Sequence, residues 1–150
     1  MNKKWLHTGA GVLAAATLTS AITTMPAHAF VSDSSATLSD VKYSAHAHSC
    51  NTYTSSCSWD SSATASTRKT FTHTTDVKAN GINVSISISA DPSVSISGNS
   101  TNMAHASRKV AGTRSSMSGV ARPSIFSISV AARSRLSTRS GNVTTGWTTW

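Results

Sequence analysis

A run of alternating apolar and polar side chains at residues 82–90 constrains the fold of this chain more than any other feature. Its apolar members are Ile82, Val84, Ile86, Ile88 and Ala90, and Asn83, Ser85, Ser87 and Ser89 lie between them. Successive side chains of a β-strand point to opposite faces of a sheet. A repeat of two residues therefore predicts a strand with one buried face and one hydroxyl-covered face.

The segment before this run, residues 70–77, alternates in the same way, and Asn80-Gly81 separates the two. Asn-Gly is the strongest short signal for a two-residue hairpin loop, because both residues tolerate a positive φ. Such a loop would pair Val77 with Val84 and bring both apolar sets to one face. The sequence therefore predicts a β-hairpin centred on Asn80-Gly81.

His73 falls on the expected core face of this hairpin, opposite Ile88. An imidazole at such a position is more often a buried, neutral, hydrogen-bonded side chain than a catalytic base. Burial disfavours the charged form of histidine and lowers its pKa. We therefore expect His73 to be structural.

A third alternating segment lies near the C-terminus. Phe126, Ile128, Val130, Ala132 and Leu136 share one face, and Ser127, Ser129, Arg133, Arg135, Ser137 and Arg139 share the other. This pattern predicts a strand that presents three arginines to solvent. Residues 100–123 fit a strand or a short helix equally well.

The first 29 residues have the organisation of a secretory signal peptide. Lys3 and Lys4 form a basic head, residues 9–21 are uncharged and rich in alanine, and Ala27-His28-Ala29 is a small-x-small cleavage pattern. We expect a leader at 1–29 and a secreted protein at 30–150. An uncleaved membrane anchor is the alternative, which the short, threonine-interrupted apolar segment disfavours.

The remaining 121 residues suit a single domain with a sparse core. Leu, Ile, Val and Phe make up about a sixth of them, and Ser and Thr more than a third. Several short alternating strands separated by turn residues predict an all-β fold, a small antiparallel β-sandwich or barrel. Disorder, or folding only on assembly, is the alternative that the thin apolar supply leaves open.

The charge of the expected secreted domain is asymmetric. Lys3 and Lys4 belong to the leader, which leaves 11 of the 13 Lys and Arg side chains against five Asp and no Glu. No acid follows Asp91, whereas seven basic residues do: Arg108, Lys109, Arg114, Arg122, Arg133, Arg135 and Arg139. A field of one sign favours anionic partners and depends on salt. A surface that serves only solubility is the alternative.

Cys50 and Cys57 are the only cysteines. In an exported protein two nearby cysteines usually pair, so we expect a disulfide between them. The alternative is a zinc or copper site, because His46, His48 and Cys50 would share one face of a strand. No fourth ligand is evident and a disulfide would remove the thiolate, so we predict no metal site.

Motifs for catalysis are missing from the sequence. It has no G-x-S-x-G elbow, no H-E-x-x-H, no phosphate-binding glycine loop and no dinucleotide fingerprint. We therefore expect no enzyme activity, no catalytic residue and no cofactor. A Ser-His-Asp arrangement stays open, because such a triad is recognised by geometry rather than by sequence order.

These observations predict a secreted cationic protein that binds anionic membrane or wall polymer of a cell envelope, with bacteriocin-like antimicrobial action as one form. The residues expected to bind are Arg108, Lys109, Arg114, Arg133, Arg135, Arg139, Trp147 and Trp150. An exposed tryptophan can insert at a membrane interface or stack on sugar rings. The alternative is that Trp147 and Trp150 both pack against the end of the core. No specific binding of nucleic acid is expected.

A self-assembling extracellular matrix protein without catalytic activity is the alternative function. Residues 84–89 form an uncharged, proline-free segment of high β-propensity. Segments of this composition favour the stacking of strands between molecules when they lie at a sheet edge.

Overall fold

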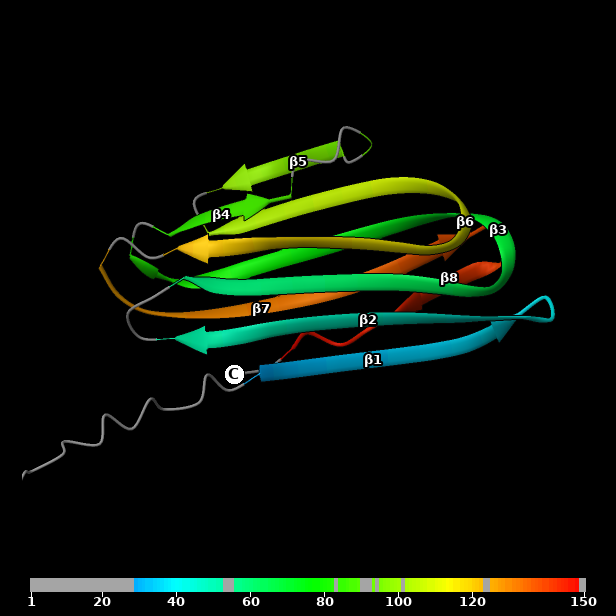
Figure 1. Ribbon diagram of the computed structural model, residues 1–150, viewed down its shortest axis with the longest axis horizontal. Helices are drawn as coiled ribbons and strands as arrows, with labels where there is room; N and C mark the ends of the chain where they lie inside the picture. The colour runs from blue at the N-terminus through cyan, green and yellow to red at the C-terminus, as the bar shows by residue number, and fades with distance from the viewer. Residues whose placement is uncertain are drawn as a thin grey trace, which may run out of the picture.

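The computed structural model describes residues 29–52, 56–82, 84–89, 93, 95–100, 102–122 and 125–148 (Figure 1). The strands are β1 (Ala29–Leu38), β2 (Val41–Thr52), β3 (Cys57–Ile82), β4 (Ser85–Ile88), β5 (Ser95–Ser100), β6 (Met103–Arg122), β7 (Ile125–Thr138) and β8 (Gly141–Thr144). All strand pairs are antiparallel. The all-β prediction is confirmed. Over the same residues, no helix has the length and apolarity needed to cross a membrane.

Two long strands, β3 and β6, fold the sheet over on itself. They pair along 57–64 with 114–121 and again along 69–78 with 103–112, with a register shift between Thr64 and Lys69. At this shift four residues of β3 stand opposite a single residue of β6. Extra residues on one strand bend a sheet. Both strands accordingly turn back at the right-hand end of Figure 1.

The bend creates two facing layers. Layer 1 consists of β1, β2, the first half of β3, the second half of β6, and β4. Layer 2 consists of β8, β7, the second half of β3, the first half of β6, and β5. A short β2–β7 pairing, Asn51 with Ser129 and Thr52 with Ile128, joins the layers at the other end. The sheet does not close into a barrel.

The predicted Asn80-Gly81 hairpin is wrong. β3 continues through these residues to Ile82 and pairs with β7, with a register shift between Asn80 and Ile82. The following strand, β4, pairs with β6 in the other layer. Val84, buried in the core, lies where the chain passes between the layers. Asn-Gly is compatible with an irregularity inside a strand as well as with a turn, and long-range pairing decides between them.

The prediction for the later strand is confirmed where its residues are described. Val130, Ala132 and Leu136 of β7 are buried, and Arg133 and Arg135 lie between them on the other face. The side chains of residues 126–128 lie outside the described part. The ambiguous region 100–123 is a strand over 103–122.

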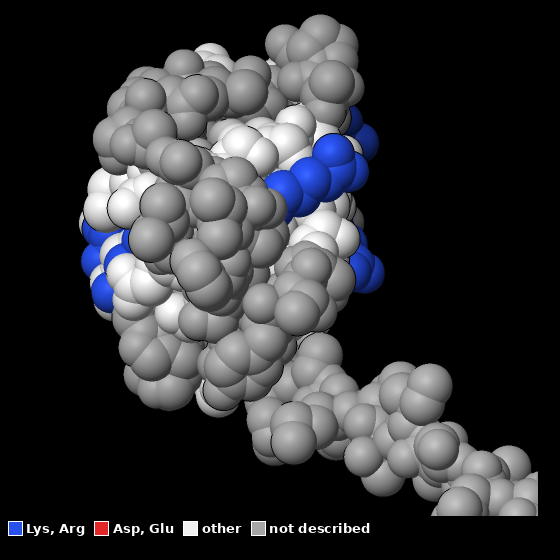
Figure 2. Space-filling model, turned by 90° about the vertical axis from the view of Figure 1, so that its left-hand side faces the viewer, with Lys and Arg blue, Asp and Glu red and all other residues white. Residues whose placement is uncertain are grey.

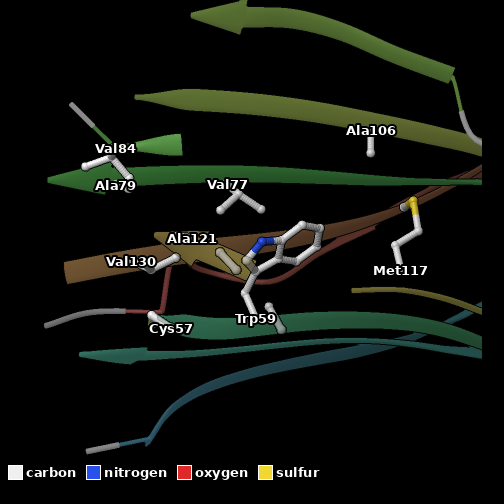
Figure 3. Packing of buried hydrophobic residues seen from close by; sticks show 11 residues of the cluster. Cys57, Trp59, Val77, Ala79, Val84, Ala106, Met117, Ala121 and Val130 are labelled. Carbon is white, nitrogen blue, oxygen red and sulfur yellow. The ribbon is translucent and has the colours of Figure 1, made fainter. Parts of the chain in front are cut away.

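The core between the layers is divided into two apolar clusters. One surrounds Trp59 and includes Val77, Met117 and Val130 (Figure 3). The other contains Tyr43, Phe71 and Leu136 with several alanines. Trp59 is 1% exposed, and its indole Nε1 finds no hydrogen-bond partner among the residues that the structure describes. No pattern in the sequence marked this residue, although it is the largest fully buried side chain of the described residues.

A buried polar cluster contributes to the same interior. His73 Nδ1 lies 3.0 Å from the Ser115 hydroxyl, and Nε2 lies 3.1 Å from that of Ser134 and 3.3 Å from that of Ser61. Burial, assisted by the positive charge of Arg108, lowers the pKa of His73 from 6.5 to about 4. The prediction of a buried, neutral His73 is confirmed, but its cross-strand partners are Leu136 and Arg108 rather than Ile88.

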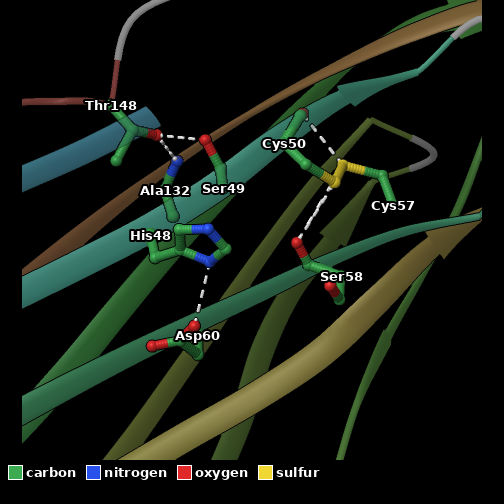
Figure 4. Close-up of a disulfide and its surroundings, with 8 residues drawn as sticks. All are labelled: His48, Ser49, Cys50, Cys57, Ser58, Asp60, Ala132 and Thr148. Carbon is green, nitrogen blue, oxygen red and sulfur yellow. Dashed lines mark hydrogen bonds and ion pairs between the residues drawn. A yellow bond between two sulfur atoms is a disulfide. The ribbon is translucent and has the colours of Figure 1, made fainter. Parts of the chain in front are cut away.

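The predicted disulfide between Cys50 and Cys57 is present. The two sulfur atoms lie at a bonding distance of 1.98 Å, and the Cα atoms are 5.7 Å apart (Figure 4). Cys57 is fully buried in the Trp59 cluster. The bridge therefore ties the end part of β2 to the first residue of β3 and to the core.

Removing this bridge is expected to lower the free energy of unfolding by about 2–3 kcal/mol, because the short cross-link restricts the unfolded chain. Urea unfolding of the Cys50→Ala/Cys57→Ala variant, compared with the oxidised protein, measures the loss. Reductant should destabilise the parent chain and leave the double variant unchanged. Equal stability of the two proteins would contradict the expectation.

Candidate anion-binding surface

The outer side of layer 2 collects basic side chains from three neighbouring strands. Alternation along each strand decides which residues point outward, because the residues between them face the core. We call the following set the basic face: Lys78, Lys109, Arg133, Arg135 and Arg139, with Asp76 and His105 among them. Arg139 lies in the turn that follows β7. Figure 2 shows Lys and Arg on both flanks of the molecule, so the opposite side also carries cations.

Strand register sets the order of these groups. Asp76 stands between Arg133 of β7 and His105 of β6. Two residues before Asp76 on β3, Thr74 stands opposite Arg135 of β7. Two residues earlier again, Thr72 stands opposite Lys109 of β6. Hydroxyl side chains of β3 therefore separate cations that come from the strands on either side.

The carboxylate of Asp76 is already engaged by its neighbours. Arg133 donates to Asp76 Oδ2 from Nη2 at 2.6 Å and from Nε at 3.1 Å, and His105 Nδ1 donates to Oδ1 at 2.5 Å. Burial alone raises the pKa of Asp76, but the hydrogen bonds and charges of Arg133 and His105 outweigh it and lower the pKa. Asp76 is therefore ionised and neutralises Arg133.

The other cations of this region differ from Arg133. Among the residues that the structure describes, Lys69, Lys109, Arg135 and Arg139 form no ion pair with a carboxylate. Their charges remain available to an anion from outside the chain. A positive charge without a partner on the same surface is the simplest source of attraction for anionic groups.

Trp147 packs beside this face rather than projecting freely from it. Its ring lies 4.6 Å from Lys78 Nζ and 4.7 Å from the guanidinium carbon of Arg133, both cation–π distances. The segment that carries Trp147 runs along β7, where Thr145 and Thr148 bond the backbone of Ser134 and Ala132. Trp147 is half-buried, and Trp150 lies outside the described residues.

The structure brings together only some of the predicted binding residues. Lys109, Arg133, Arg135, Arg139 and Trp147 lie on or beside the basic face. Arg108 lies on the inner side of β6, near His73, because it alternates with Lys109. Arg114 lies on the outer side of layer 1.

Lys69 and Lys78 were missed in the sequence analysis. Lys78 alternates with the buried Val77 and Ala79, a signal that was present in the sequence. Lys69 follows the bend of β3, for which we found no signal. Lys69 and Lys78 both add positive charge to layer 2. They lie before Asp91, outside the acid-free half of the chain from which the binding residues were predicted.

The outer side of layer 1 has a different character. His46 Nδ1 donates to Asp33 Oδ1 at 2.6 Å, and His48 Nδ1 lies 3.0 Å from Asp60 Oδ2 (Figure 4). With Cys50 in the disulfide, the three residues of the metal alternative do not form a site. No group of three His, Cys, Asp or Glu side chains in the described part of the chain could hold a metal ion.

No protein-family model, curated protein or solved structure matches this chain. The arrangement of charges on the two outer sides is therefore the basis for the function proposed below.

Proposed function

We propose that this chain is a secreted protein whose basic face binds anionic membrane or wall polymer of a cell envelope. The observation that supports the proposal is a group of cations in layer 2, Lys69, Lys109, Arg135 and Arg139, that form no ion pair with any carboxylate of the described residues, whereas Arg133 beside them is neutralised by Asp76. Antimicrobial action of the bacteriocin type is one consequence that such binding would allow. The leader on which secretion depends lies outside the described residues, apart from Ala29.

The expected strength of binding follows from the number of charges. Each Lys or Arg near an anionic membrane contributes about 1 kcal/mol, and exposed charges are screened within about 10 Å at 0.1 M salt. Lys109, Arg135 and Arg139 together should therefore supply about 3 kcal/mol at low ionic strength. Attachment should be measurable at low salt and should weaken as salt is added.

Neutralising these three residues is expected to reduce the affinity for anionic vesicles and isolated cell walls at low salt by at least about tenfold. The test compares Lys109→Gln/Arg135→Gln/Arg139→Gln with Lys42→Gln/Arg114→Gln/Arg122→Gln, measured by cosedimentation at two salt concentrations. The second variant removes the same charge from the outer side of layer 1 and is the matched control.

We expect the control variant to bind nearly as well as the parent protein. Equal losses in the two variants would show that only net charge matters, and the basic face would no longer be the site. A parent protein that ignores both vesicles and walls at low salt would overturn the proposed function itself.

Self-assembly into an extracellular matrix is the second candidate. β4 lies at one end of the strand order and pairs with β6 alone among the described strands. An edge strand can add a strand from another molecule. Sedimentation velocity over a concentration series tests this function, and a monomer that persists at every concentration would exclude it.

A further inference from the structure

A groove of about 670 Å³ lies where the basic face meets the turns at the bent end of the molecule. Three of its 12 lining residues are cations, Lys69, Lys109 and Arg139, and none is an acid. Asp40, which follows the lining residue Ser39 in the chain, is not among them. The groove therefore gathers three of the cations that lack an ion-pair partner in the described structure.

The fold explains why these three residues meet. Lys69 is the first residue of β3 to pair with β6 after the bend, and Lys109 lies on β6 opposite Thr72. Thr72 also pairs with Ser137 of β7, two residues before Arg139. Neighbouring strands lie about 5 Å apart, so side chains from three strands reach one groove.

The wall and floor of the groove are held by contacts of their own. The Thr138 hydroxyl donates to the Gly141 carbonyl at 2.9 Å and accepts from the Ser140 amide at 3.1 Å. Ser39 reaches across to the Ser140 hydroxyl at 3.1 Å, which links the β1–β2 turn to the β7–β8 turn. Tyr43 and Phe71, both buried in the core, contribute to the lining.

We infer that this groove binds a hydroxyl-bearing phosphate, a glycerol- or sugar-phosphate unit of an envelope component. Several anionic oxygens suit three converging cations, and an arginine can hold a phosphate with two parallel hydrogen bonds. The hydroxyl groups of Thr70, Thr72 and Ser137 can bond the alcohol groups of such a unit. The volume lies within the range of small-molecule sites. This inference rests on the proposed function and specifies its ligand.

The same chemistry occurs in a polyol-phosphate wall polymer and in the headgroup of a phosphatidylglycerol membrane. Glycerol 1-phosphate is therefore the first probe, titrated into the purified protein and followed by NMR chemical shifts or calorimetry. Inorganic phosphate, glycerol and glucuronate are the comparison ligands. A soluble polyol-phosphate oligomer and phosphatidylglycerol vesicles then distinguish the two sources.

The Lys69→Gln/Arg139→Gln variant should bind glycerol 1-phosphate at least about tenfold more weakly than the parent protein, since it loses two charge-assisted contacts. The Arg135→Gln variant, which removes a cation of the same face outside the lining, should change the affinity less than about twofold. Comparing Arg135→Gln with Arg139→Gln alone gives a matched pair of single arginine substitutions, one outside the groove lining and one in it. Urea unfolding of each variant confirms that the fold is kept.

The results separate the groove from the face as a whole. A parent protein that binds vesicles and walls but not glycerol 1-phosphate, or a groove variant that binds it unchanged, would overturn the groove and leave the proposed function standing. If glucuronate bound as tightly as glycerol 1-phosphate, the assignment of the groove to phosphate would be wrong. If inorganic phosphate bound as tightly as glycerol 1-phosphate, the recognition of the ligand's hydroxyl groups would be wrong. A parent protein that binds none of these partners would overturn both proposals.

Discussion

Replacing Gly119 with alanine is expected to lower the free energy of unfolding by about 3 kcal/mol or more, near the upper end of overpacking effects. Gly119 lies on the inner side of β6, paired with Trp59 of β3 and Ile88 of β4. A Cβ atom at this position would overlap the carbonyl oxygen of Ser87 and would lie 2.5 Å from Cζ2 of the Trp59 indole. Neither neighbour can yield easily, because one is backbone and the other is a ring enclosed by the core.

Urea and thermal unfolding of the two proteins, followed by tryptophan fluorescence, measure this effect. A loss of this size would lower the melting temperature by on the order of 10 °C in a domain of this length. Gly112→Ala in the same strand is the control, because a Cβ there meets nothing closer than Val110 Cγ1 at 3.5 Å. A Gly119→Ala variant that unfolds like the parent protein would show that β4 does not pack against β6 as described.

Acidification from pH 6.5 to pH 4 is expected to remove about 3 kcal/mol of stability through His73 alone. The unfolded chain takes up a proton on this imidazole near pH 6.5, whereas the folded protein does so only near pH 4. Between these values the unfolded state binds more protons than the native state. The stability contributed by neutral His73 is therefore complete above pH 6.5 and is lost as the pH falls towards 4.

Urea unfolding at several pH values between 7 and 4, in the parent and in His73→Gln, isolates this contribution. The variant starts from a lower stability but should lose less of it across the window, because its amide does not titrate. Asp76 acts in a separate window: its lowered pKa places its loss of stability below pH 3.8, its ordinary value. Parallel curves for the two proteins would show that His73 is not the group responsible.

Local patterns in the sequence predicted the features that depend only on neighbours in the chain. Alternation placed Arg133 and Arg135 on the outer face of β7 and His73 on the inner face of β3, as the structure has them. The spacing of Cys50 and Cys57 predicted their bridge. In each case one strand, or one short connection, carries the whole physical argument.

Features that depend on distant pairing were not predictable in this way. Asn80-Gly81 satisfies a turn and an irregularity within a strand equally well, and the pairing of β3 with β7 selects the second. Nothing in residues 65–68 marks the bend, so the meeting of Lys69 with Arg139 was not foreseen. The prediction of Arg108 as a residue of the binding surface was also wrong. Which face of β6 it occupies depends on the strand pairing of residues 103–122, which the sequence left open between strand and helix.

The two bent strands have a consequence for how this protein can misfold. A slip of one residue between paired strands exchanges the inward and outward side chains of the slipped strand. Here β3 and β6 pair with each other on both sides of their bend, in two separate registers. A slip in either layer must therefore be absorbed within the few residues at the corner or be transmitted to the opposite layer, where it would bury charges. Because the two halves of β3 and β6 are covalently continuous through the corner, the register in one layer restricts the register that the other layer can adopt.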